Sequence, residues 1–276
     1  MSAPQKLLIV NADDFGFTRD VNDGIIQAHT GGILTATTLM ANGAAFDHAV
    51  ALARRHPGLD VGCHLVLAGG HSLVVPNRPF PSNLRALVLA LARGQLNPEQ
   101  EAEAQIRRIL EAGIRPTHLD THKHTHLLPP VLEAVARLAA RYGIPWVRRP
   151  FDYPMHSGSV PVARRLLSRS FHFLRRRFHR VLDKHGCRTT DHFAGFRLTG
   201  VLRTKELVEL LEQLPAGSTE FMTHPGFCTE ELRQARTRLK ESRLHELEAL
   251  THPDTREAVL RNGVRLVRYR DLEASQ

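Results

Sequence analysis

The stretch "KLLIVNADDFG" (residues 6–16) passes from four consecutive apolar residues into a polar segment with two adjacent carboxylates. A short apolar run of this kind is typical of a strand buried in a parallel sheet. Asp13 and Asp14 follow it at the position where such a strand ends. Because parallel α/β proteins place their functional side chains at the carboxyl ends of the strands, this stretch indicates both a fold class and a site.

The rest of the chain repeats this arrangement, with apolar runs of strand length alternating with helical patterns. Further strands are expected at 35–43, 59–67, 117–122, 144–150, 218–226 and 263–272. Helices are expected near 20–32, 46–58, 84–93, 98–113, 129–143, 203–213, 229–250 and 254–262. The alternation predicts an α/β protein with one domain over 1–276. It leaves open whether about seven or eight mostly parallel strands close into a (β/α) barrel or form a doubly wound sheet.

Composition excludes several classes of protein. The 276 residues include three scattered cysteines, Cys63, Cys187 and Cys228, which do not suggest a disulfide framework. No segment approaches the roughly 20 consecutive apolar residues that cross a bilayer. The first residues run directly into the strand at 6–10 without the pattern of a signal peptide. We therefore expect a cytoplasmic protein with reduced cysteines.

Four polar clusters stand within or directly after apolar strands. They are "NADDFG" (11–16), "GCHLVL" (62–67), "HLDTHKHTH" (118–126) and "MTHPG" (222–226). One such strand end would mean little. Four of them, rich in aspartate and histidine, predict one shared site, because the loops at the carboxyl ends of barrel strands converge.

The adjacent carboxylates of Asp13 and Asp14 would point to opposite sides of an extended chain. Two like charges in one site need a cation or a proton to neutralise them. One aspartate can then bind a metal while the other acts as general base. The alternative is that the pair caps the following helix, as aspartate often does. The residues alone leave both interpretations open.

The histidines at the second and third clusters are candidate ligands. His64 lies in a hydrophobic run, where a lone histidine is more often a core residue than a ligand. His122, His124 and His126 alternate, so in an extended segment they would share a face with Asp120. Three imidazoles and a carboxylate in this pattern favour a metal site over the alternative, a polar surface loop.

Two further strand ends carry candidate catalytic groups. His224 precedes a Pro-Gly turn, which would fix its imidazole for proton donation near neutral pH. Arg148 and Arg149 end the strand at 144–150. An arginine there could pair with Asp13 and keep it ionised, or it could be a surface charge.

These motifs, in this order, resemble those of the YdjC-like carbohydrate deacetylases, a family that includes chitooligosaccharide and hopanoid-associated deacetylases. The resemblance spans about residues 6 to 270 and is weakest at 68–115 and 155–200. It implies a distorted (β/α) TIM-like barrel and a divalent metal, with Mg²⁺ named first and Zn²⁺ as the alternative. By motif, the resemblance assigns three metal ligands and three catalytic residues: Asp14, His64 and His122 as ligands, Asp13 as base, His224 as acid and Arg148 as the residue that orients the base.

The resemblance implies hydrolysis of the N-acetyl group of an amino sugar, either a chitooligosaccharide or an N-acetylglucosaminyl lipid such as a hopanoid glycolipid. A metal suits this chemistry, because an amide carbonyl is a poor electrophile until it is polarised. Two alternatives are hydrolysis of another bond such as a phosphoester, and a sugar- or lipid-binding barrel without catalysis. The complete set of Asp13, Asp14, His64, His122 and His224 argues against the binding-only alternative, and no motif supports nucleic-acid binding.

The formal charge of +9 is concentrated in one segment. Between 160 and 185 eight Arg or Lys face a single acid, which leaves a net charge of only +2 for the rest of the chain. A helix is expected over 162–185, within an insertion near 160–186, with Pro161 before it and Gly186 after it. Its apolar stripe consists of Leu167, Phe171, Leu174, Phe178 and Val181. The stripe either packs on the barrel or a partner subunit, as in a homo-oligomer, or lies on the inner membrane face as a peripheral contact.

Overall fold

The computed structural model describes residues 5–155 and 162–273. Eight strands within these residues form one sheet in which every pairing is parallel. The strands are β1 (Lys6–Phe15), β2 (Ala36–Leu39), β3 (Asp60–Leu65), β4 (His118–Thr121), β5 (Trp146–Val147), β6 (His192–Ala194), β7 (Gly217–Thr223) and β8 (Val264–Leu266). Their spatial order is β5-β4-β3-β2-β1-β7-β6, with β8 also paired to β1.

The sheet is organised around β1, its longest strand. One edge of β1 pairs with β7 over Lys6–Ala12. The other edge pairs first with β8, up to Leu8, and then with β2 from Asn11 onward. This sharing of one edge explains why the strand expected at 263–272 is short. Beyond Leu266 the edge of β1 belongs to β2, and the chain forms the helix α12 (Tyr269–Glu273) instead.

The two outer strands meet across a line of single bridges, here called the seam, between residues 146–153 and 188–193. The seam consists of the bridges Trp146–Arg188 and Asp152–Phe193. The N–H of Val147 donates to the carbonyl of Arg188, and the N–H of Tyr153 to that of Phe193, each at 2.9 Å. The sheet thus curls into a distorted barrel, and the predicted TIM-like fold is confirmed.

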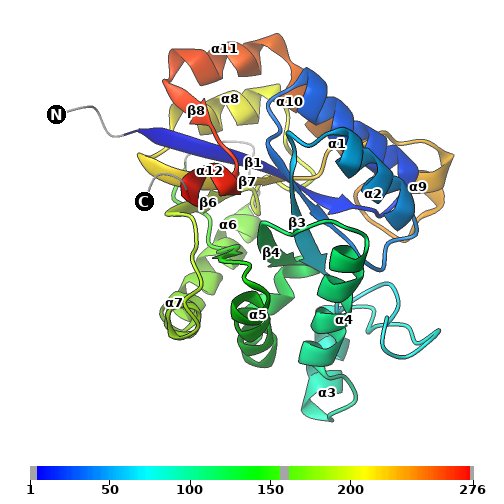
Figure 1. Cartoon of the computed structure of the whole chain (residues 1–276). Helices are drawn as coiled ribbons and strands as arrows, with labels where there is room; N and C mark the ends of the chain where they lie inside the picture. The colour runs from blue at the N-terminus through cyan, green and yellow to red at the C-terminus, as the bar shows by residue number, and fades with distance from the viewer. Residues whose placement is uncertain (1–4, 156–161, 274–276) are drawn as a thin grey trace.

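The helices cover the outside of the curled sheet in two groups. In Figure 1, α1, α2, α8, α10 and α11 lie on one side of it and α3, α4, α5 and α7 on the other. The helices are α1 (Arg19–Gly31), α2 (Phe46–Arg55), α3 (Leu84–Ala92), α4 (Pro98–Glu111), α5 (Pro129–Tyr142), α6 (Val162–Phe171), α7 (Arg175–Lys184), α8 (Thr204–Glu212), α9 (Glu230–Gln234), α10 (Glu241–Thr251), α11 (Pro253–Arg261) and α12 (Tyr269–Glu273), with short 3₁₀ turns η1 (His122–Leu127) and η2 (His172–Leu174).

Local sequence explains the helix boundaries. Two prolines begin α5, and Gly143 ends it in the left-handed conformation, with φ 64°. Asn97 caps α4 by accepting from the N–H groups of Glu99 and Gln100. The prediction of a single helix over 229–250 is wrong. It is two helices, α9 and α10, separated by a loop that borders the cavity described below.

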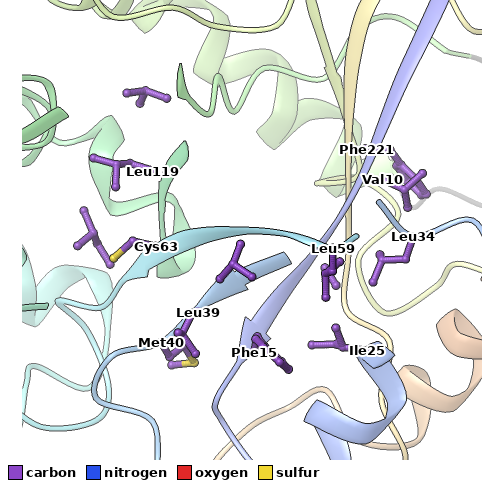
Figure 2. Close-up of a cluster of buried hydrophobic side chains, with 14 of the residues drawn as sticks. Val10, Phe15, Ile25, Leu34, Leu39, Met40, Leu59, Cys63, Leu119 and Phe221 are labelled. Carbon is purple, nitrogen blue, oxygen red and sulfur yellow. The ribbon is translucent and has the colours of Figure 1, made fainter. Parts of the chain in front are cut away.

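The hydrophobic core fills the space between the strands and the helices. Figure 2 shows a part of it, which includes Val10, Phe15 and Leu39 from the strands and Ile25 from α1. All four side chains are fully buried. Burial of this kind contributes roughly 1.5–3 kcal/mol for each large apolar side chain and holds the strand ends in place.

The three cysteines are buried, and none of them forms a disulfide. This agrees with the prediction that their number and positions do not suggest a disulfide framework. None of the helices in the described part of the chain is long and apolar enough to cross a membrane.

Candidate metal and catalytic site

Asp13 and Asp14 are buried at the end of β1, and both line one cavity of about 540 Å³. The prediction that they point to opposite sides of an extended chain is therefore wrong. The pairing of β1 with β2 shifts register between Ala12 and Phe15, and Asp14 adopts a left-handed φ of 70°. This irregularity turns both carboxylates toward the cavity. The alternative of helix capping also fails, because Thr18 caps α1.

Asp14, His64 and His122 come together from three different strand ends. The Asp14 Oδ1 atom lies 3.5 Å from His64 Nε2 and 3.4 Å from His122 Nδ1. The two imidazole nitrogens are 3.3 Å apart. The three predicted metal ligands thus form a compact group of donor atoms that could hold a metal ion.

The spacing of these donors fits a small divalent cation. Tetrahedral bonds of about 2.1 Å would place neighbouring ligand atoms about 3.4 Å apart, and octahedral bonds of the same length about 3.0 Å apart. The observed triangle of 3.3–3.5 Å is close to these values. One face of the group opens into the cavity, since all three residues line it. Positions for water and substrate therefore remain, as a catalytic site requires.

Asp120 orients His64, one of the three candidate ligands. Its Oδ1 atom accepts from His64 Nδ1 at 2.8 Å, which leaves Nε2 directed toward Asp14. Burial lowers the pKa of His64, but the carboxylates of Asp120, Asp13 and Asp14 outweigh it and raise that pKa to about 9. The pocket therefore attracts positive charge at this nitrogen, which a metal ion would supply in place of the proton.

Arg243, from α10, holds the second oxygen of Asp14. Its Nη2 atom donates to Asp14 Oδ2 at 2.5 Å, and the guanidinium is almost completely buried. Burial opposes ionisation of Asp14, yet Arg243 and His122 keep its pKa well below the usual value. Arg243 was not among the residues predicted from the sequence. It lies in a helix with no neighbouring motif, so no local signal marks it.

Arg148 binds the other carboxylate. Its Nη1 and Nη2 atoms donate to the two oxygens of Asp13 at 2.8 and 2.7 Å. The same side chain also reaches Asp120 and Glu220, each at 2.6 Å. Burial raises the pKa of Asp13, but Arg148, together with His64 and His224, outweighs it and lowers that pKa below its usual value, so Asp13 stays ionised. The predicted pairing of Arg148 with Asp13 is confirmed, while Arg149 contacts the carbonyls of Thr190 and Asp191.

A second group with metal-like spacing, Asp13, His64 and Asp120, has a different explanation. The guanidinium of Arg148 donates to both of its carboxylates. The positive charge that this group requires is thus already present in the chain, and the open donor set is the one formed by Asp14, His64 and His122.

His224 lies beside Asp13 at the end of β7. Its Nε2 atom is 3.9 Å from Asp13 Oδ2, and its backbone N–H donates to Glu246 at 2.6 Å. Burial lowers the pKa of His224, against the opposing effect of the Glu246 and Asp13 carboxylates. The imidazole is therefore neutral near pH 7 and can gain a proton during a reaction.

The segment after β4 differs from the prediction. His122, His124 and His126 do not alternate along an extended chain, because they lie in the 3₁₀ turn η1, where Lys123 and His124 have left-handed φ values of 57° and 51°. His122 joins the ligand group and His124 lines the cavity. His126 is buried behind them and donates from Nε2 to the carbonyl of Arg148 at 3.0 Å.

His118 supports the site at one remove. Its Nε2 atom donates to Asn11 Oδ1 at 3.0 Å, and the amide of Asn11 donates to Asp13 Oδ1 at 3.1 Å. His118 and Asn11 thus help to fix Asp13 together with Arg148.

The cavity walls combine apolar and basic side chains. Phe17, Met40, Phe196 and Met222 line it, and so do Lys123, Arg236 and Arg238. Such a mixture is typical of sites that bind a polar organic molecule.

The model of the YdjC-like protein family matches residues 7–261. A carbohydrate deacetylase of Geobacillus stearothermophilus is 35% identical over 96% of this chain and 98% of its own. A carbohydrate deacetylase of Halalkalibacterium halodurans is 38% identical over 88% of this chain and 94% of its own.

Among solved structures, a protein of Enterococcus faecalis V583, provisionally described as a cellobiose-phosphate cleavage protein, superimposes with a TM-score of 0.75. It is 26% identical, and the match covers 97% of this chain and 99% of that one. Because the family model and these relatives cover nearly the whole length, the chain belongs to the YdjC-like family of carbohydrate deacetylases.

Proposed function

We propose that this protein is a metal-dependent carbohydrate deacetylase that hydrolyses the N-acetyl group of an amino sugar. The observation that carries this proposal is the open triangle of Asp14, His64 and His122 in the same cavity as the Asp13–Arg148 pair and His224. The names of the relatives support a hydrolase that acts on carbohydrate. Water would supply oxygen to the acetyl carbon, the C–N bond would break, and acetate and a free amine would leave.

Asp14, His64 and His122 would hold the ion. A divalent cation there would polarise the amide carbonyl and lower the pKa of the attacking water. We propose Mg²⁺ first and Zn²⁺ as the alternative, since a set of one carboxylate and two imidazoles does not select sharply between them.

Asp13 would accept the proton of the attacking water. Arg148 and Asn11 fix its carboxylate, which favours one productive orientation. The low pKa of Asp13 makes it a weak base, so a proton gained there would leave again readily. The proton can then reach the departing nitrogen.

His224 would deliver that proton to the nitrogen: its neutral imidazole would take up the proton that Asp13 received from the water and pass it on. Its Nε2 atom faces Asp13 at 3.9 Å, and the backbone bond to Glu246 fixes the turn that carries it. An amine leaves an acetyl group only when it is protonated, so this step requires an acid on the cavity wall.

The volume of the cavity, about 540 Å³, suits a ligand of the size of a small saccharide. We propose N-acetylated amino sugars as the substrate class, in the form of chitooligosaccharides or the headgroup of an N-acetylglucosaminyl lipid.

Acetate release tests the proposal. The protein would be stripped with a chelator, reloaded separately with Mg²⁺ or Zn²⁺, and incubated with chitooligosaccharides, N-acetylglucosaminyl lipids and a phosphoester control. Acetate from at least one amino sugar, only after reloading, is the expected result. Phosphoester hydrolysis without acetate release would replace the proposal with a phosphoesterase. Sugar binding without any turnover would replace it with a binding protein.

A further inference from the structure

The basic segment predicted as one helix consists of α6, η2 and α7, and its two faces differ. The predicted apolar stripe faces the protein along most of its length. Phe178 is 1% exposed, and Phe171, Leu174 and Val181 pack partly buried against the core. Leu167 departs from the stripe with 48% exposure. Packing on the barrel therefore accounts for the inner face.

The outer face carries a second apolar row. Val162, Leu166 and Phe173 are 67%, 61% and 78% exposed. Their spacings of four and seven residues place them on one side of a helix. The backbone stays in the right-handed helical region at Phe171, Leu174 and Arg175, so the helical path continues into α7. Arg176, Arg177 and Arg180 follow Phe173 by three, four and seven residues and therefore continue its side.

The continuation of the same face is strongly basic. Arg176, Arg177 and Arg180 are exposed, and within the described residues none of them forms a salt bridge. A surface hollow of about 770 Å³ lies here, lined by His172, Arg175, Arg176, His179, Arg180 and Asp183. Asp183 is its one carboxylate. The hollow is thus suited to an anionic group.

We propose that this outer face, formed by Val162, Leu166, Phe173, Arg176, Arg177 and Arg180, binds the surface of an anionic phospholipid bilayer. Exposed Leu, Val and Phe insert at the boundary between headgroups and acyl chains, while neighbouring arginines contact the phosphates. A second copy of this chain does not match the face, because it would bring like charges together. A nucleic acid would match the arginines but leave three large apolar side chains in water.

The helix α6, which carries most of the apolar row of the outer face, also contacts the wall of the cavity. The ring of Phe171, on the inner side of α6, lies 5.2 Å from that of Phe196, which lines the cavity. A bilayer on the outer side of α6 would therefore lie near the cavity wall. This consequence rests on the proposed function: it favours an N-acetylated sugar carried by a membrane lipid.

Sedimentation of the full chain with vesicles tests the binding. The expected result is binding to phosphatidylcholine vesicles that contain phosphatidylglycerol and little or none to phosphatidylcholine alone. Arg176→Gln with Arg180→Gln should weaken binding about 30-fold, since each basic residue near an anionic membrane surface strengthens binding roughly fivefold. Leu166→Gln with Phe173→Gln should weaken it at high salt as well, where charge effects are screened.

Matched controls remove the same groups elsewhere. Arg107→Gln with Arg265→Gln and Leu89→Gln with Leu260→Gln change exposed residues on other elements and should bind like the unchanged protein. Equal binding by all four variants, no lipid-dependent sedimentation, or tighter binding of duplex DNA through the same arginines would each overturn the proposal. Acetate release from a soluble substrate should be unchanged in every variant, so failure of membrane binding is distinguishable from failure of the deacetylase assignment.

Discussion

Asp14 and Asp13 are neighbours in sequence but have different partners, and this separates their expected roles. Asp14 shares its two oxygens between the imidazoles of His64 and His122 on one side and Arg243 on the other. Asp13 shares its two oxygens with Arg148. This difference supports the proposal that Asp14 holds a cation and that Asp13 exchanges a proton.

Substitutions at these positions should therefore have distinct effects. Asp14→Ala and His122→Ala should abolish metal binding and activity together. Asp13→Asn should retain the metal and lower kcat by roughly 10²–10⁴-fold, the usual contribution of a general base. Metal content by mass spectrometry and acetate release would be measured on the same samples. Full activity of Asp13→Asn would contradict its role.

Arg243 should act as a positioning residue for the metal ligand. Its loss leaves Asp14 Oδ2 without its buried partner, so Arg243→Gln should weaken metal affinity on the order of 10–100-fold. Arg243→Lys, which keeps the charge, should recover part of that affinity. Competition with a chelator dye measures it. A variant that only melts at a lower temperature, with unchanged metal affinity, would assign Arg243 a purely structural role.

At the scale of the elements, the 3₁₀ turn η1 stores backbone strain beside the site. Lys123 and His124 both have left-handed φ values, which cost roughly 1–2 kcal/mol in a residue with a side chain. The turn places His122 in the ligand group and His126 behind it, so the strain accompanies the arrangement of the site.

Lys123→Gly should accordingly be more stable than Lys123→Ala by about 1 kcal/mol, because both variants lose the same amine but only glycine relieves the strain. Urea denaturation of the two variants under the same metal-free conditions gives the difference. If Lys123→Ala were equally stable, the turn would not be strained at this residue.

The sequence predicted most elements, and its failures have physical causes. The apolar runs located β3 and β7 closely, because buried parallel strands carry a strong local pattern. They also located the start of β1, but that strand continues to Phe15, beyond the predicted 6–10. The three-residue β6 and the turn η1 were missed, since each depends on contacts made by distant segments. At the site, His64 was placed by its motif, whereas Arg243, Glu220 and Glu246 lie in helices and strands whose local pattern is ordinary.

At the scale of the whole molecule, buried neutral histidines link stability to pH. Burial is the main cause that lowers the pKa of His118 well below its usual value and that of His126 to about 3. In the unfolded chain both would take up protons near pH 6.5. The unfolded state then binds more protons than the folded state, so stability is lost as the pH falls below about 6.5.

Between pH 6.5 and its pKa in the folded protein, each of these two histidines should lower the free energy of unfolding by up to about 1.4 kcal/mol for each unit that the pH falls. Urea denaturation of the metal-free protein at several pH values from 7 to 5 measures the slope. His126→Gln should reduce that slope even though it also lowers stability at pH 7. An unchanged slope would show that His126 is not neutral in the folded state.

The seam of the barrel has a consequence for how the molecule opens. Its few backbone bonds join residues 146–153 to residues 188–193, and α6 and α7 lie in the chain between these two segments. Amide hydrogens of Val147 and Tyr153 should therefore exchange with deuterium sooner than those of β1, which is bonded along both edges. A force on α6 and α7, for example when they bind a surface, would therefore act on the seam, where we expect the barrel to open first.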